Sequence, residues 1–236
     1  MTKRNPWWYA PDDFLSLFYP RLCLACGKNL HSNEEIICLF CAYKLPKTNF
    51  HKYRENPLTR HFWGRVNISS GAAMYYFNKG GKVQQLIHRL KYLNKPNIGV
   101  KLGEIYGQHL KKSEWMMQPE VIIPVPLHPW KLKKRGYNQS LTFANGLASI
   151  MEKPVSKAMR RKTMTRTQTA KSRLERFNNV LEAFEVTNPE AVEGLHVLLV
   201  DDVITTGATL EACAIKLLEV PGVKVSVVTI AFAMMR

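Results

Sequence analysis

Residues 196–209, HVLLVDDVITTGAT, combine residue types that can hold a phosphorylated ligand. The apolar run Val197–Val200 predicts a buried parallel strand, and apolar residues at helical spacing from Leu210 to Leu218 predict a helix. The turn between them contains Thr205, Thr206, Gly207, Ala208 and Thr209. Unpaired backbone N–H groups and the positive end of the helix dipole meet at such a turn. The turn therefore predicts a phosphate site.

Two carboxylates, Asp201 and Asp202, directly precede this turn. They suit a ribose diol or a hydrated Mg²⁺ better than a second phosphate, so we expect a phosphorylated sugar. An ordinary strand–turn–helix connection with a threonine N-cap is the alternative. The strand, the acids, the loop and the helix follow one another in the order that such a site requires, which favours the ligand site. An ATP-binding P-loop is excluded because no lysine follows the glycine at the required position.

The segment resembles the signature of type I phosphoribosyltransferases, which bind 5-phosphoribosyl-1-pyrophosphate (PRPP). In that family the loop holds the 5′-phosphate and the acids face the ribose hydroxyls. The resemblance gives Asp201 and Asp202 the catalytic positions. It implies PRPP binding by Asp201, Asp202, Val203, Thr205, Thr206, Gly207, Ala208 and Thr209.

The cysteines predict a metal site. Cys23 and Cys26 form one C-x₂-C pair, and Cys38 and Cys41 form a second one, with eleven residues between the two pairs. This layout is typical of a four-thiolate structural zinc site with no open position for catalysis. Redox chemistry is the alternative for a single pair, but two pairs favour zinc. Metal binding would supply most of the folding energy of so small a unit.

Strands and helices alternate along the rest of the chain, which implies a parallel sheet and an α/β fold. We expect strands at 71–77 and 121–126 and helices near 83–90 and 100–110, with 42–70 as a connector. Residues 1–50 would form an N-terminal helix, around Phe14–Tyr19, and the zinc finger. Residues 51–236 would form a domain of the type I phosphoribosyltransferase fold, a parallel sheet flanked by helices.

A basic segment follows the second expected strand. It contains Lys131, Lys133, Lys134 and Arg135. Because ligands bind at the carboxyl ends of parallel strands, we expect Lys131, Lys134 and Arg135 to neutralise a pyrophosphate. A plain basic loop is the alternative.

The whole chain is also basic, with 34 Lys and Arg against 18 Asp and Glu and a formal net charge of +16. Basic residues dominate from Lys153 to Arg176, where Glu175 is the one acid. Such charge attracts nucleic acid or a PRPP-like ligand, with solubility as the alternative. We find no secretory signal and no run of eighteen apolar residues, so we expect a cytoplasmic protein.

Further motifs resemble the ComF family over about Phe14 to Ala231. After the two cysteine pairs, they are Leu90–Tyr92, Ile123–His128, Arg135–Gln139, Gln168, Arg176, Asn179–Val180, Ala183–Phe184 and Asp201–Thr209. Members of this family are phosphoribosyltransferase-like proteins with an N-terminal zinc finger. Those of transformable bacteria act in DNA uptake, and the related GntX group was named for gluconate utilisation. Lys171 is a departure, because the family usually has leucine there.

The resemblance implies a hood, residues 160–179, that closes over the site, with Arg160, Arg161, Gln168 and Arg176 as its candidate ligand-binding residues. It implies Mg²⁺ bound with PRPP. One function is a PRPP-responsive competence protein that contacts single-stranded DNA and docks a ComFA-like helicase or a DprA-like recombination mediator. Another is an active transferase, for which the sequence indicates no acceptor. A plain zinc-finger DNA binder would leave the acid–threonine loop unexplained.

Overall fold

A computed structural model describes residues 20–162 and 179–234. The expected helix at Phe14–Tyr19 lies outside these described residues, as do Gln168, Lys171 and Arg176. The chain divides into two compact units, Met1–Leu45 and Pro46–Arg236.

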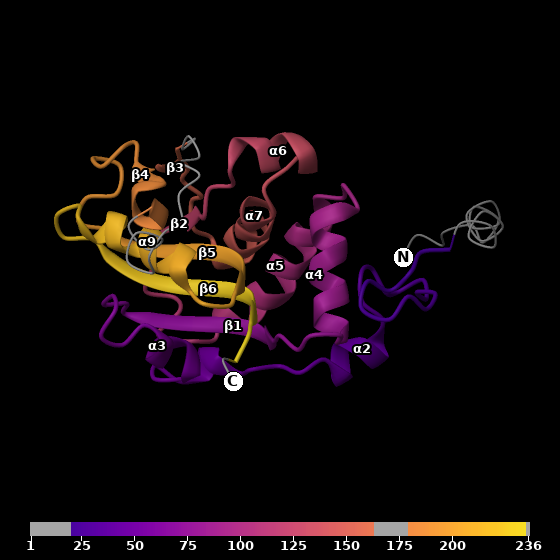
Figure 1. Ribbon diagram of the computed structural model, residues 1–236. Coiled ribbons are helices and arrows are strands. Elements are labelled where there is room, and N and C mark those ends of the chain that lie inside the picture. Colours follow the sequence, from indigo (N-terminus) through magenta and orange to yellow (C-terminus); the bar gives the residue numbers. More distant parts are fainter. Residues whose placement is uncertain (1–19, 163–178, 235–236) are drawn as a thin grey trace, which may run out of the picture. The chain divides into compact units, whose positions relative to one another are not determined.

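The larger unit contains a four-stranded parallel sheet in the order β1-β6-β5-β2 (Figure 1). Its strands are β1 (Ser70–Tyr76), β2 (Val121–Pro124), β5 (His196–Ile204) and β6 (Lys224–Phe232). The central strand β5 pairs with both neighbours, and its run Val197–Val200 is fully buried. This confirms the expected parallel strand with both faces covered.

Four longer helices belong to the described part of this unit. They are α4 (Lys82–Tyr92), α5 (Asn97–Leu110), α7 (Gln139–Met151) and α9 (Ala208–Leu218). Helix α7 packs on β2 and β5, and α9 packs on β5 and β6. Helix α5 packs along α7 (Figure 1). The predicted α/β fold, a parallel sheet flanked by helices, is therefore confirmed.

Glycines allow α5 and α7 to touch along their backbones. A Cβ on Gly103 would lie 2.3 Å from the carbonyl oxygen of Phe143, and one on Gly146 would lie 1.9 Å from that of Val100. Real Cβ atoms do not come so close, so any side chain at either position would force the helices apart. The start of α7 is thus fixed by its packing on α5.

The expectation of a connector over 42–70 was wrong. The region contains η2 (Phe50–Lys52) and α3 (Pro57–His61). Asn56 caps α3 through its side chain, and its Nδ2 donates to the carbonyl oxygen of Gly71 at 2.8 Å. Phe50, Leu58 and Phe62 are buried. Helices of three and five residues are too short to show a helical period in the sequence.

A second, two-stranded antiparallel sheet pairs β3 (Met159–Arg161) with β4 (Phe184–Val186). In the smaller unit, α2 (Leu39–Lys44) begins directly after Cys38. Among the described residues, no helix is both long and apolar enough to cross a bilayer.

Candidate functional site

A cavity of about 550 Å³ lies over the carboxyl ends of β2 and β5. Residues of both predicted ligand-binding segments line it. They are Asp201, Asp202, Val203, Thr205 and Thr209 from β5 and the turn after it, and Lys131 and Arg135 from the basic segment. The fold therefore brings together acids, threonines and cations that lie about 70 residues apart in the sequence.

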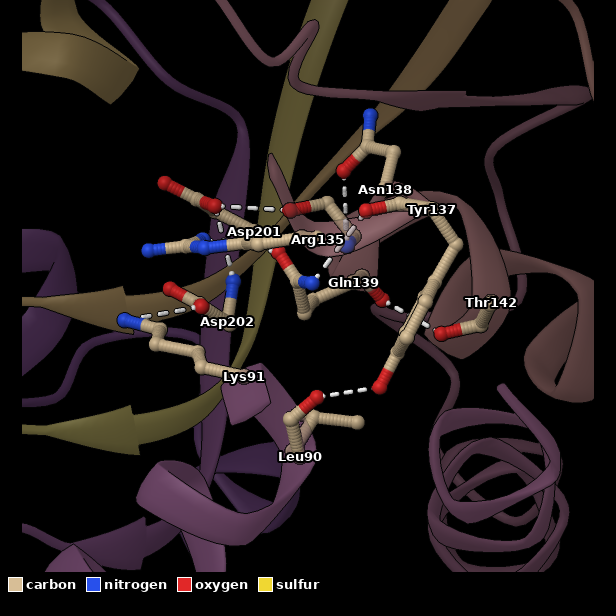
Figure 2. Close-up of polar contacts among 10 residues, drawn as sticks. Leu90, Lys91, Arg135, Tyr137, Asn138, Gln139, Thr142, Asp201 and Asp202 are labelled. Carbon is tan, nitrogen blue, oxygen red and sulfur yellow. Dashed lines mark hydrogen bonds and ion pairs between the residues drawn. The ribbon is translucent and has the colours of Figure 1, made fainter. Parts of the chain in front are cut away.

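The acids lie against α7 and α4 (Figure 2). Asp201 Oδ1 accepts hydrogen bonds from Ser140 Oγ and from the backbone N–H of Asp202, both at 2.8 Å. Burial and the neighbouring charge of Asp202 raise the pKa of Asp201 to about 7. Asp202 Oδ2 lies 2.9 Å from Lys91 Nζ. Near neutral pH Asp201 is thus poised between its protonated and ionised forms.

The loop at the end of β5 has the geometry of an anion site. Gly207 takes φ +74°, a left-handed conformation that favours glycine, and directly precedes α9. No side chain caps the first turn of α9 within the part of the chain that is described. Thr205 and Thr206 are exposed. The free N–H groups at the start of α9 are therefore available to an anion.

The basic segment forms a helix, α6 (Pro129–Arg135). The His128 side chain caps it by accepting from the N–H of Trp130 at 3.2 Å, and Gly136 ends it with φ +76°. Lys131 and Arg135 are four residues apart, so they share the face that lines the cavity. Lys134 is exposed and lies over the Trp130 ring, with Nζ 5.4 Å from its centroid, outside the cavity lining.

The segment after α6 connects three parts of the site (Figure 2). Tyr137 donates its hydroxyl hydrogen bond to the carbonyl oxygen of Leu90 at the end of α4. Asn138 accepts from the N–H of Ser140 at 3.0 Å and thereby caps α7. Gln139 Oε1 accepts from Arg135 at 2.8 Å. These bonds fix Arg135 and Ser140 relative to α4.

The structure describes two of the hood candidates, Arg160 and Arg161, and their side chains lie in different places. Arg161 lines the cavity. Arg160, beside it on β3, forms an ion pair with Glu185 on β4. Successive side chains of a strand point to opposite faces, which explains why neighbours differ.

Helix α4 contributes a wall that the sequence analysis did not assign. The wall contains Gln84, Ile87, His88, Lys91 and Tyr92. Their spacing of three to four residues places them on one face of α4. Lys91 and Tyr92 belong to the motif Leu90–Tyr92, which was the available signal.

The four cysteine Sγ atoms of the smaller unit lie within 4.8 Å of one another. The distance from Cys26 Sγ to Cys38 Sγ is 3.8 Å, which is also the edge of a tetrahedron with Zn–S bonds of about 2.3 Å. Cys38 N–H donates to Cys23 Sγ at 3.3 Å, and Gly27 turns the first pair with φ +78°. The cluster therefore fits a zinc site.

Comparisons with known proteins agree with this geometry. A phosphoribosyl transferase domain matches residues 138–235. Over most of its length the chain is similar to Competence protein F of Haemophilus influenzae, with 34% identity covering 88% of this chain and 94% of that protein. The DNA utilization protein YhgH of Salmonella typhimurium is 33% identical over 55% of this chain and 58% of its own length. The chain thus spans less than two thirds of that relative.

Competence protein ComFC of Bacillus subtilis is 34% identical over 42% of this chain and 38% of its own length. Among solved structures, a glutamine phosphoribosylpyrophosphate (PRPP) amidotransferase from B. subtilis is 22% identical with a TM-score of 0.41, over 59% of this chain and 30% of that one. The phosphoribosyl transferase match at 138–235 contains β5, the turn after it and β6, so the observed α/β fold is the predicted phosphoribosyltransferase type.

Proposed function

Because this chain belongs to the ComF family of competence proteins, we propose that it binds PRPP in the described cavity and acts on imported DNA during natural transformation. The turn from Thr205 to Thr209 is called the phosphate loop below. The observation that carries the proposal is that the two acids, this loop and the cations of α6 meet around one cavity of about 550 Å³. Each group of residues matches one part of PRPP.

The 5′-phosphate would bind the N–H groups and hydroxyls of the turn from Thr205 to Thr209. Asp201 and Asp202 would accept hydrogen bonds from the ribose hydroxyls. Lys131 and Arg135 would neutralise the pyrophosphate, with Arg161 on the same cavity wall. Mg²⁺ would enter with PRPP and offset the charge of its pyrophosphate.

Two outcomes are compatible with this site. In a transferase, the acceptor would displace pyrophosphate from the anomeric carbon through an oxocarbenium-like transition state, and the residues above would supply position and charge neutralisation. In a binding protein, PRPP would act as a signal. We favour the binding protein for the biological role, because the similar proteins are named for competence and DNA utilization.

Single-stranded DNA is the proposed macromolecular partner, and the surface formed by α6 and the neighbouring end of α4 supports this. Trp130 is 62% exposed and Tyr92, at the neighbouring end of α4, is 56% exposed. Lys134 lies over Trp130, and the Arg135 guanidinium lies 5.7 Å from the Tyr92 ring centroid. In proteins that bind single-stranded nucleic acid, unpaired bases stack on exposed aromatic rings and the phosphates contact neighbouring cations. We call these residues, with Lys133, the α6 platform.

Zinc is the proposed metal of the cysteine cluster, with a structural role. A four-thiolate cluster has no open position for catalysis, so we assign its surface to partner docking. The candidate partners are a ComFA-like helicase and a DprA-like recombination mediator. A GntX-like role in gluconate utilisation is the alternative biological setting for the same site.

Calorimetry with PRPP and Mg²⁺ tests the proposal. The wild-type protein should bind PRPP, and Asp201→Ala with Asp202→Ala should abolish the binding. Equal affinity in the wild type and the double variant would reject the site. Incubation with PRPP, Mg²⁺ and a panel of nucleobases then distinguishes the two outcomes, because pyrophosphate release requires transfer and binding alone does not.

A further inference from the structure

The side chains of His61 and Arg65 both reach the carbonyl oxygen of Thr206, inside the phosphate loop. His61 Nε2 lies 3.0 Å from it and Arg65 Nη1 lies 3.2 Å from it. In the tautomer with the proton on Nε2, both groups donate to this one oxygen. In the other tautomer Arg65 donates to the carbonyl, and His61 Nε2, 3.1 Å from Arg65 Nη1, accepts from the guanidinium and holds it there. His61 ends α3 and Arg65 follows one turn later, so the donors come from a segment far from the loop in the sequence.

These donors fix the direction of the next peptide. The unit from Thr206 C=O to Gly207 N–H is planar and trans, so its C=O and N–H point in opposite directions. Neither His61 nor Arg65 is among the residues that line the cavity, whereas Thr205 and Thr209 are. A carbonyl held toward α3 therefore turns the Gly207 N–H away from α3, toward the side on which the N-terminus of α9 is open.

Without these donors the peptide would be free to rotate. Gly207 is at φ +74°, and glycine accepts positive and negative φ about equally well. A rotated peptide would direct the carbonyl lone pairs at the phosphate and withdraw one N–H donor. The contact with α3 is also close, because a Cβ on Gly207 would lie 2.7 Å from His61 Nε2.

Arg65 is itself held in place by α9. Its Nη2 forms an ion pair with Glu211, which lies in the first turn of α9 and is 4% exposed. The guanidinium thus joins the carbonyl before Gly207 to the helix after it. His61 is packed edge-on against Phe62 and Phe232, with ring centroids 5.5 and 6.3 Å away.

We propose that His61 and Arg65 are positioning residues that hold the Thr206–Gly207 peptide in the orientation that binds the 5′-phosphate. This inference depends on the proposed function, since it concerns the same loop. It assigns to α3 and its following turn a role in ligand binding that acts through the loop and needs no contact with the ligand.

The test compares His61→Phe, Arg65→Gln and their double variant with the wild type, using ribose 5-phosphate, PRPP and inorganic pyrophosphate as separate probes in calorimetry. His61→Phe keeps the ring packing and removes the donor. Affinity for ribose 5-phosphate and PRPP should fall at least about tenfold in the double variant. Pyrophosphate affinity should not change, because Lys131 and Arg135 are untouched. Arg65→Lys keeps a cationic donor, so its affinity for ribose 5-phosphate should lie between those of Arg65→Gln and the wild type.

Arg60→Gln is the matched control. It removes an exposed arginine whose guanidinium lies over Trp63, at 5.7 Å, and it should leave all three affinities unchanged. Unchanged ribose 5-phosphate affinity in the double variant overturns the inference, and so does an equal loss for pyrophosphate. A wild type that binds neither PRPP nor ribose 5-phosphate overturns the proposed function as well.

A measurement on the wild type covers the case in which the variants fail to fold. In protein labelled with ¹⁵N-glycine, ribose 5-phosphate should shift the Gly207 amide resonance and slow its exchange with water. The resonance of Gly80, which is exposed in the turn before α4, should not change. An unaffected Gly207 amide at saturating ribose 5-phosphate overturns the inference.

Discussion

Lys91 and Asp202 form an ion pair of 2.9 Å inside the candidate PRPP cavity, between α4 and the end of β5. The pair places a cation beside two adjacent carboxylates before any ligand has bound. The Lys91 charge also lowers the pKa of Asp201, against the larger opposite effects of burial and of Asp202.

Lys91→Met should weaken Mg²⁺-dependent PRPP binding by about tenfold, which corresponds to about 1.4 kcal/mol. Loss of the cation leaves Asp202 unpaired and should raise the pKa of Asp201 further above 7. Calorimetry measures the affinity, and carboxyl ¹³C titration measures the pKa. Lys95→Met, an exposed lysine just after α4, is the control. An Asp201 pKa equal in Lys91→Met and wild type would contradict the assigned coupling.

Asp201 should make the folded protein less stable as pH rises. Its folded pKa of about 7 lies above the ordinary 3.8, so the folded state holds a proton that the unfolded chain releases. The stability that this proton contributes is present below about pH 4 and lost through pH 7. Asp201→Asn should therefore flatten this dependence and raise the free energy of unfolding at pH 8 above that of the wild type. Urea unfolding at several pH values measures the free energy of unfolding. Curves of this free energy against pH that run parallel for variant and wild type would contradict the prediction.

Zinc should be present at about one ion per chain, and Cys26→Ser with Cys41→Ser should reduce it to the background level. Metal analysis measures the content, and hydrogen exchange should show that residues 20–45 lose protection because metal binding carries the folding of this unit. Cys213→Ala is the control, since Cys213 is buried in α9 of the larger unit. A folded smaller unit in a zinc-free preparation would reject the site.

Trp130→Ala should weaken binding of single-stranded DNA by about 1–3 kcal/mol, because a base loses its stacking partner on the α6 platform. Lys133→Ala with Lys134→Ala should instead reduce the slope of log K against log salt by about 1.4, as two phosphate contacts are lost. Fluorescence anisotropy at several salt concentrations measures both. Trp63→Ala is the control, because Trp63 is 60% exposed beside Arg60 but is not part of the platform. Equal losses for the two tryptophans would remove α6 from the DNA surface.

The sequence predicted those parts of the site whose residues follow one another closely in the chain. The strand Val197–Val200, the acids and the turn follow one another in the chain, and β5 and α9 form where the apolar pattern places them. The four cysteines were also predictable, because the spacing within each pair determines a tight turn.

Other parts depend on contacts that have no local signal. His61 and Arg65 meet Thr206 only after the chain has folded, and neither lies on a predicted element. Helix α6 has seven residues and buries none of them, so it shows no apolar period. Pro129 at its start and Gly136 at its end were the readable signals for that helix.

The glycine contact between α5 and α7 limits where this protein can change its ligand preference. Ser140, in the first turn of α7, holds Asp201, and α7 cannot shift without separating backbones that touch at Gly103 and Gly146. Gln84 and His88 line the cavity from α4, outside the contact between α5 and α7. Altered selectivity, in evolution or in the laboratory, should therefore arise first from substitutions at Gln84 and His88, while α7 stays constant.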